Sequence, residues 1–409
     1  MPNLRTLVWR DWNASLNFDV VPLAERLFAP GLVSLDVSFK GEVEGQRPLF
    51  ERLSILSPNL ETLRWDFGYH SYDPILHVVD ALASSVVCLR KIQSLDFFAP
   101  MDSDTLKQIV LSPNFKELGV MLDHPFSDAE EMVITPTDMP FPNVETIGLD
   151  IWNLHFLTHF LRPHQQRFVD VTLEFHPEGR ARVQPILSCF IALATPQRMD
   201  SVEAFRFLLH ANCVQDDKLT RPEELENSPL DYCLTYETLS PLTSFQYLSE
   251  LEITLHNQIS LDDDELVSLA RCWPSLQILQ LNCRAGGWPW ASAKYPTLRG
   301  LLALIEACPD LWNLCLPIDA RTVPTDVSPD MYDTAIRELE VPDGLISEPY
   351  LVAAFLRTHL PSLTALTAST IWEFPLRGGD VEYLERCRCM WEVVGGMLRD
   401  RDGDVDMVG

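Results

Sequence analysis

The chain has 409 residues, of which 46% are hydrophobic, and a formal net charge of −28. This hydrophobic content is ordinary for a folded protein, and the large excess of acid argues against nucleic acid as a partner. The longest apolar run, near residues 186–194, is too short to cross a bilayer, and the N-terminus lacks a signal-peptide pattern, so we expect no membrane segment. Ten cysteines without a signal peptide predict reduced thiols and a cytoplasmic or nuclear location.

One pattern recurs from the first residues onward: an apolar residue, a second three positions later and a third two positions after that. Pro58-Asn59-Leu60 opens a copy whose later apolar positions are Leu63 and Trp65. The last step is strand alternation, and the proline ends any preceding helix. We find thirteen copies, whose first apolar positions are Leu4, Leu32, Leu60, Ile92, Phe115, Val144, Phe168, Val202, Leu248, Leu276, Leu311, Ile336 and Leu363.

Segments with helical spacing separate these strands. In chain order they are Val21–Ala29, Pro48–Leu56, Pro74–Val87, Ser103–Leu111, Leu154–Leu161, Val183–Ala194, Asp262–Cys272, Leu298–Ala307 and Glu348–Leu360. Strand and helix in alternation, repeated mostly near the leucine-rich-repeat length of about 20–29 residues, predict stacked units that bury one continuous core. The expected fold is an α/β solenoid, a leucine-rich-repeat horseshoe with an inner parallel sheet and outer helices.

The repeats predict a single solenoid over residues 1–395, followed by a charged, disordered tail over residues 396–409. Before the tail, Val381–Leu398 is expected to be a helix covering the last repeat. Residues 210–244 are expected to be an exposed loop because of their polar character. Residues 283–296 form a second insertion, whose Trp288 and Trp290 either pack on the insertion itself or anchor a partner.

The start of the chain lies inside a repeat rather than in a polar cap, which a solenoid normally needs to cover its first strand. Either an N-terminal piece is missing from this chain or another protein covers that edge. We favour the missing piece.

Motifs of known enzyme classes are absent, since the sequence has no Gly-x-x-x-x-Gly-Lys, Gly-x-Ser-x-Gly or His-Glu-x-x-His. His155 and His159 share one predicted helical face, but no carboxylate partner lies in register with them. Cys387 and Cys389 lack further ligands nearby, and the acidic residues of 402–406 lack the rest of a calcium loop. We therefore expect no catalytic residue, no metal and no cofactor.

Acidic residues flank the buried strand positions, where side chains must point to the concave side of the sheet. They are Asp36, Asp66, Asp96, Glu117, Asp150, Asp170, Glu174, Glu250, Glu252, Glu338 and Glu340. The basic residues at such positions are only Arg10, Arg64 and Arg206. We expect Asp36 and Asp96 to share one register, with Asp66 displaced by two residues, and to repel each other unless a cation lies among them. A wall of one sign favours a basic protein partner, although these acids could also serve only to keep a long solenoid in solution.

The copies with Pro-Asn-Leu-x-x-Leu, at residues 2–7, 58–63 and (with Phe115) 113–118, resemble the leucine-rich-repeat halves of fungal F-box proteins over roughly residues 1–395. The resemblance implies a non-catalytic scaffold, the substrate-recognition half of a ubiquitin-ligase receptor. An F-box docks on a Skp1-type adaptor, and no stretch here has the F-box pattern, so this adaptor is an expected partner only if an N-terminal F-box is missing from this chain. The alternative is a stand-alone repeat adaptor or inhibitor that binds a basic protein on its acidic concave face.

Overall fold

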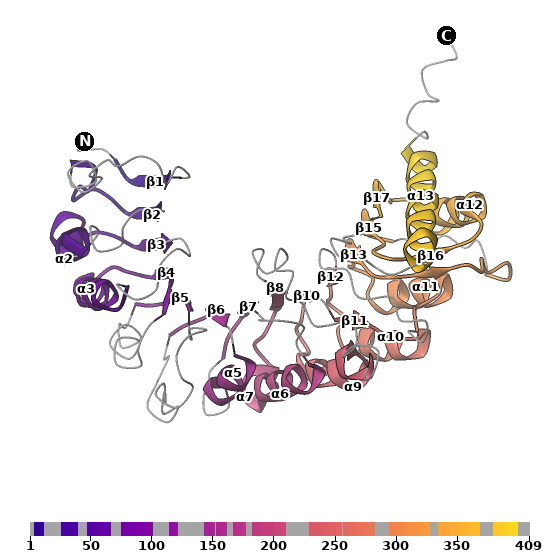
Figure 1. The fold of residues 1–409 in the computed structure, drawn as a ribbon, viewed down its shortest axis with the longest axis horizontal. Coiled ribbons are helices and arrows are strands. Elements are labelled where there is room, and N and C mark those ends of the chain that lie inside the picture. Colours follow the sequence, from indigo (N-terminus) through magenta and orange to yellow (C-terminus); the bar gives the residue numbers. More distant parts are fainter. Residues whose placement is uncertain are drawn as a thin grey trace, which may run out of the picture. The chain divides into compact units, whose positions relative to one another are not determined.

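The computed structural model describes residues 4–11, 26–39, 47–66, 75–100, 114–121, 143–151, 153–161, 167–176, 182–209, 229–255, 257–282, 294–327, 334–368 and 379–399. The chain divides into two compact units, Met1–Glu174 and Phe175–Gly409. Figure 1 shows the strands and helices of both units in chain order.

All thirteen copies of the apolar pattern form strands, each beginning two residues after its first apolar position. The strands of the first unit are β1 Thr6–Asp11, β2 Ser34–Phe39, β3 Thr62–Asp66, β4 Ser94–Pro100, β5 Glu117–Met121, β6 Thr146–Ile151 and β7 Asp170–Phe175. Those of the second unit are β8 Ala204–Leu209, β10 Glu250–Thr254, β12 Ile278–Leu281, β13 Asn313–Cys315, β15 Glu338–Glu340 and β17 Ala365–Thr367. Within each unit the strands follow chain order and the described pairings are parallel.

Helices lie between these strands, largely where the sequence predicts them. The first unit has α2 Arg47–Leu56, α3 Ile75–Cys88 and α5 Leu154–Leu161; the second has α6 Val183–Leu193, α7 Pro196–Met199, α9 Tyr236–Leu239, α10 Asp263–Ala270, α11 Leu298–Ala307, α12 Pro349–His359 and α13 Gly379–Arg399. The expected helix Ser103–Leu111 and most of Val21–Ala29 lie outside the described residues. In the first unit α2 and α3 lie on one side of β1 to β4 (Figure 1).

The core lies between that side of the sheet and the helices. The rings of Phe50 on α2 and Trp65 on β3 pack with their centroids 4.4 Å apart. The middle apolar positions of the repeats are almost fully buried: Leu63, Leu118, Ile147, Leu251, Leu279 and Leu314. The fold is therefore an α/β solenoid of the leucine-rich-repeat kind. In the first unit, the described helices leave uncovered the face that carries the alternate strand positions.

The second unit corrects one expectation. Residues 229–244, expected to belong to an exposed loop, form two 3-10 turns, η4 Pro229–Tyr232 and η5 Ser240–Ser244, together with β9 Cys233–Leu234 and α9. Leu234, Leu239 and Leu242 are buried there, because these apolar residues pack inward while the polar part of the insertion, residues 210–228, lies outside the described residues. Short strand pairs join β9 to β11 Gln258–Ile259 and β14 Asp319–Ala320 to β16 Leu345–Ile346.

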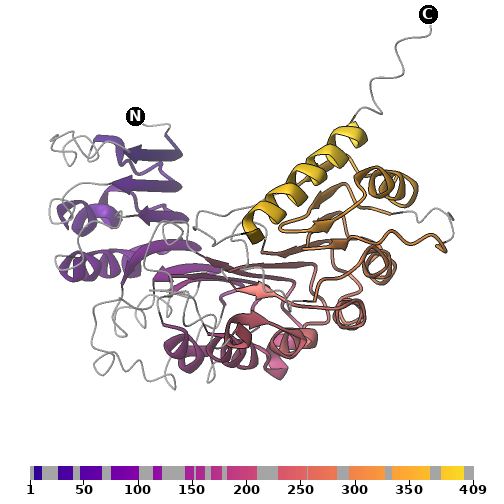
Figure 2. The same ribbon diagram turned by 45° about the vertical axis from the view of Figure 1, so that its right-hand side comes forward.

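The terminal helix is confirmed as α13, which packs against α12 and β17 and appears in yellow in Figure 2. It continues to Arg399, past the expected start of the tail at residue 396, because Val394 and Gly395 are still buried against the last repeat. Residues 400–409 lie outside the described residues. No described helix is both long and apolar enough to span a bilayer.

Among the residues that the structure describes, seven cysteines are free: Cys88, Cys189, Cys233, Cys272, Cys308, Cys387 and Cys389. Cys315, however, is disulfide-bonded, so the expectation of reduced thiols throughout the chain is wrong at this residue. The prediction of reduced thiols rested only on the expected cellular compartment. It could not take account of the distances between cysteines in the folded chain.

Replacing a core leucine by alanine should destabilise either unit. We expect Leu63→Ala and Leu279→Ala each to cost about 2–5 kcal/mol in the free energy of unfolding, because both side chains are buried and leave a cavity. Urea titration measures this cost. Ile55→Ala, at a residue that is 73% exposed on α2, is the control and should change stability by less than about 0.5 kcal/mol. An equal effect of the control and the core variants would contradict the assigned core.

Candidate functional site

The turn before each strand fixes how neighbouring repeats align. In the copy at Leu60, the amides of Glu61 and Thr62 both donate to the carbonyl of Val33, at 2.8 and 3.1 Å. Asn59 Nδ2 adds a bond of 2.7 Å to the carbonyl of Pro30. Asn114 makes the same kind of bond to Arg90, at 2.6 Å. The backbone amides therefore tie each of these strands to the one before it and keep the repeats in phase, and the asparagine adds a side-chain bond.

Because the repeats are in phase, alternate residues form rows across the uncovered face of the first unit, which we call the open face. One row runs Val8, Asp36, Arg64, Asp96, Gly119 and Gly148, from β1 to β6. The row before it consists mainly of small hydroxyl residues, namely Thr6, Ser34, Thr62, Ser94, Glu117 and Thr146. The open face therefore carries mainly hydroxyl groups in one row and, in the next, the alternating charges of Asp36, Arg64 and Asp96.

The expected register of the acids is confirmed, and the cation among them belongs to this chain. Arg64 lies between Asp36 and Asp96 in the same row, and its Nε is 3.3 Å from Asp96 Oδ2. Arg10 approaches Asp36 at 2.8 Å. Asp66 lies two residues further along β3 and accepts a bond of 3.0 Å from the Ser38 hydroxyl. Each arginine on the open face of the first unit is thus already close to an acid.

A hollow opens where the row reaches its two glycines. Its volume is ≈ 270 Å³, and its lining includes Arg64, Asp96, Glu117, Gly119, Gly148, Asp150, Thr172 and Glu174. A Cβ on Gly119 would lie 2.5 Å from Asp96 Oδ1, so the Asp96 carboxylate leans over the place where a side chain would stand. A Cβ on Gly148 would meet nothing closer than the Gly119 Cα at 3.6 Å, so this glycine leaves the floor open. Two adjacent glycines therefore create a recess whose walls include four acids, Asp96, Glu117, Asp150 and Glu174.

The acids of this hollow are poorly compensated. Burial, with smaller contributions from the charges of Glu174, Asp36 and Asp66, raises the pKa of Asp96 to about 6 despite the lowering effect of Arg64. Burial and the charge of Asp150 likewise raise the pKa of Glu174 above its ordinary value. A positive group placed in the hollow would be attracted to both carboxylates.

The other acids expected on the concave side take different places in the first unit. Glu117 is exposed and Asp170 is half-buried, and both lie at the strand-start end of the open face. Asp150 is only 3% exposed, so it acts on a ligand chiefly through its charge on Glu174. Asp96 and Glu174 are therefore the carboxylates best placed to touch a ligand in the hollow.

In the second unit the corresponding acids have close polar partners. Arg206 holds Glu250 through two bonds of 2.6 Å, on the neighbouring strands β8 and β10. Glu338 accepts a bond of 2.8 Å from the Asn313 amide, which itself accepts one of 3.2 Å from Gln280. Glu252 and Glu340 are half-buried and also interact with neighbouring groups. These acids therefore interact with side chains on neighbouring strands, and no hollow is described between them.

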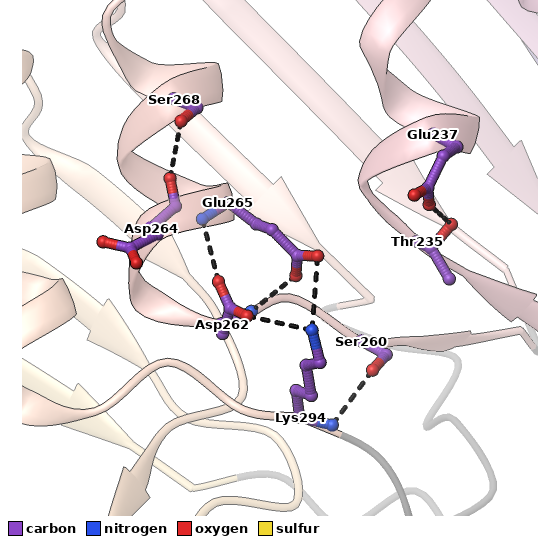
Figure 3. A network of polar contacts seen from close by, with 8 residues as sticks. All are labelled: Thr235, Glu237, Ser260, Asp262, Asp264, Glu265, Ser268 and Lys294. Atoms are coloured by element: carbon purple, nitrogen blue, oxygen red, sulfur yellow. Dashed lines mark hydrogen bonds and ion pairs between the residues drawn. The ribbon is translucent and has the colours of Figure 1, made fainter.

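A second acidic cluster, at the start of α10, is structural (Figure 3). Asp262 caps the helix by accepting from the Glu265 amide at 2.9 Å, and Glu265 accepts from the Asp262 amide at the same distance. Lys294 Nζ lies 2.9 Å from Asp262 and 3.4 Å from Glu265. The backbone bond to Glu265 and then the Lys294 ammonium lower the pKa of Asp262. This acidic turn, which the sequence predicted as a helix start, already has its cation.

Among the described residues no cluster of histidine, cysteine, aspartate or glutamate could hold a metal ion. His155 is exposed on α5, whereas on α13 Cys387 is buried and Cys389 is exposed. The side chain of His159, the residues Trp288 and Trp290, and residues 402–406 lie outside what the structure describes.

The hollow itself was not anticipated from the sequence. Its acids were predicted for the concave side, but nothing singled out Gly119 and Gly148, which stand at the same position of two successive copies. Glycine inside a strand weakens it and often marks a close approach of a ligand or another backbone. Two such residues in register were the available signal.

Comparison with known proteins does not identify a function for this hollow. No family model and no curated protein matches the sequence. The solved structures with a similar fold include one of the Rad7 and Elc1 complex in yeast, with 14% identity, a TM-score of 0.49 and coverage of 87% of this chain and 82% of that one. LegL7 of Legionella pneumophila has 16% identity, a TM-score of 0.37 and coverage of 89% and 94%. The Leptospira interrogans repeat protein LIC12759 has 14% identity, a TM-score of 0.33 and coverage of 86% and 82%. At these values the likenesses carry no argument about function.

The raised pKa of Asp96 makes stability depend on pH. The pKa of Asp96 is 3.8 in the unfolded chain and about 6 in the folded protein, so the folded state holds this proton more tightly. The free energy of unfolding therefore falls as the pH rises from about 4 through about 6. Replacing Asp96 by Asn removes this loss. We therefore expect the free energy of unfolding of Asp96→Asn, minus that of wild type, to increase by about 1 kcal/mol between about pH 4 and pH 7. This figure is smaller than the full pKa difference implies because the carboxylate is partly exposed. Urea titrations across this range measure the change, and a pH-independent difference would contradict the raised pKa.

Proposed function

We propose that the protein is a non-catalytic protein-interaction scaffold whose open face binds a basic polypeptide segment. The observation that carries this proposal is the hollow above Gly119 and Gly148. Asp96 and Glu174 line it, and its lining contains one arginine, Arg64, against four acids. Its volume of ≈ 270 Å³ is below the range of about 300–1,000 Å³ typical of small-molecule sites, and it suits one inserted side chain. A lysine or arginine there would relieve the repulsion between the carboxylates.

The other acids of the concave side would extend this surface. Asp36 on β2 and Asp66 on β3 lie before Asp96 on β4, whereas Glu117 and Asp170 lie at the strand-start end of the same face. Their charges attract a basic segment at longer range and raise its rate of association more than its affinity. Glu250 and Glu252, on β10 of the second unit, stay predicted contacts of a basic partner, although Arg206 already holds Glu250.

The narrower candidate is a substrate receptor of a ubiquitin ligase, and the alternative is a stand-alone adaptor or inhibitor. The Pro-Asn-Leu copies, which resemble the repeats of fungal F-box proteins, support the receptor. A stable complex of the full-length gene product with a purified Skp1-type adaptor would favour it. If no complex forms, the stand-alone adaptor or inhibitor remains. Both readings use the open face to hold a partner.

Removing the charge of the hollow should weaken a basic probe. The probe is a labelled peptide of alternating lysine and glycine, measured by fluorescence anisotropy at about 0.15 M salt. We expect the double variant Asp96→Asn with Glu174→Gln to bind it about tenfold more weakly, since two poorly compensated carboxylates are lost. The control, Asp310→Asn with Glu306→Gln, removes the same charge from exposed residues of the second unit and should change binding less than about twofold.

A second variant separates the hollow from the general acidity of the chain. Gly148→Val fills the floor without changing any charge, and its β-branched side chain suits a strand. Weaker binding by this variant, with an unchanged thermal melt, supports insertion of a partner side chain. Two results together would contradict the proposal: Gly148→Val binds as well as wild type, and Asp310→Asn with Glu306→Gln loses as much affinity as Asp96→Asn with Glu174→Gln. The acids would then act only as a solvated surface.

A further inference from the structure

A second charged surface of the first unit has the opposite sign. Five basic residues, Arg5, Arg90, Lys91, Lys116 and Arg167, lie just before the strands β1, β4, β5 and β7, along the edge where these strands begin. All five are exposed. We call this set the basic edge. It stands out in a chain whose net charge is −28.

The basic edge arises where the repeat departs from its motif. The copies at Leu60, Phe115 and Val144 have Pro and Asn before the first apolar residue. The fourth copy has Arg90 and Lys91 in these places, and the seventh has Arg167 in place of the asparagine. Asn59 and Asn114 bind backbone carbonyls, whereas Lys91 and Arg167 occupy the same position without that role. Structure alone therefore does not require a cation at either place.

None of the five side chains of the basic edge makes a hydrogen bond or ion pair with any residue that the structure describes. This contrasts with the open face, where Arg10 and Arg64 each contact an acid. The two acids among the basic residues, Glu61 and Glu145, also make no such contact through their side chains. The cations of the edge are thus available to a ligand.

Two hollows make this edge a continuous surface. The larger, of ≈ 790 Å³, is lined by Arg90, Lys91, Lys116 and Arg167 with the two glutamates and with polar amides. The smaller, of ≈ 530 Å³, is lined by Arg5 and by Asn59. Glu61 and Lys91 line both hollows. From β1 to β7 there are six strand steps, or about 29 Å at ~4.8 Å per step, which an extended chain of roughly nine residues would span.

We propose that the basic edge binds a short acidic segment of a partner protein. At physiological salt the Debye length is about 8 Å, so an acidic group at the edge experiences these five cations and the two glutamates among them more than the distant acids of the chain. A long polyanion such as RNA would extend beyond the edge and meet the negative surroundings. A short carboxylate-rich segment confines its charge to the hollows. This surface is separate from the hollow on the open face, and its occupant has the opposite charge.

The test uses a labelled peptide of about ten residues with alternating glutamate and glycine, so that the glutamates of an extended chain face one side. A peptide with glutamine in place of glutamate is its neutral control. At about 0.15 M salt we expect the acidic peptide to bind at least about tenfold more tightly than the neutral one. Equal affinity of the two peptides would overturn the proposal.

The variants locate the binding. Lys91→Glu with Lys116→Glu should weaken the acidic peptide about tenfold or more, and Lys91→Gln with Lys116→Gln should have a smaller effect in the same direction. Because these side chains are exposed and unpartnered among the described residues, the thermal melt should stay unchanged. The matched control, Arg26→Glu with Arg271→Glu, makes the same charge change at other exposed residues and should weaken binding less than about twofold.

Two further results would overturn the proposal. One is an equal loss of affinity in the control variant, which would mean that only net charge matters. The other is tighter binding of a single-stranded RNA of matched length that is lost in the Lys91→Glu, Lys116→Glu variant, which would assign the edge to nucleic acid. The outcome is independent of the open face, because Asp96→Asn with Glu174→Gln should leave the acidic peptide bound.

Discussion

The structure depends on one recurring hydrogen-bonded junction between repeats. Before most strands, two successive backbone amides donate to a single carbonyl of the preceding copy, as Gln93 and Ser94 do to Glu61, and Gln277 and Ile278 do to Ser249. This junction appears in both units and does not depend on side-chain identity. It keeps the copies in phase although their lengths in sequence differ, since the extra residues are accommodated between the strands.

Keeping the repeats in phase determines where charge accumulates in the first unit. Residues far apart in sequence become neighbours within one row, so that Asp36, Arg64 and Asp96 alternate across three strands. The same register places Gly119 beside Gly148, which opens a hollow next to these charges. At the edge where the strands begin, the same register brings Lys91 and Lys116 to the lining of one hollow. One backbone constraint therefore produces an acidic recess on a face and a basic strip along an edge.

The sequence was sufficient to predict the strands, because each copy contains its own apolar alternation and most copies carry Pro in the preceding turn. It was also sufficient for the register of Asp36 and Asp96, which follows from counting positions within copies. Side-chain direction and local compensation could not be predicted, because they depend on neighbours in other copies. Thus Arg64 turned out to be the cation between the acids, and the leucines of residues 229–244, which follow a polar stretch in the sequence, turned out to be buried.

The central claim is that the acids of the hollow lack a full complement of positive charge and would gain it from a partner. A carbon-13 NMR titration of the Asp96 carboxyl, with and without the lysine–glycine peptide, tests this most directly. In the free protein we expect an apparent pKa of about 6, as burial and the neighbouring acids require. With the peptide bound, it should fall toward the ordinary value of about 4. A midpoint near 4 in the free protein, or one that the bound peptide leaves unchanged, would contradict the account.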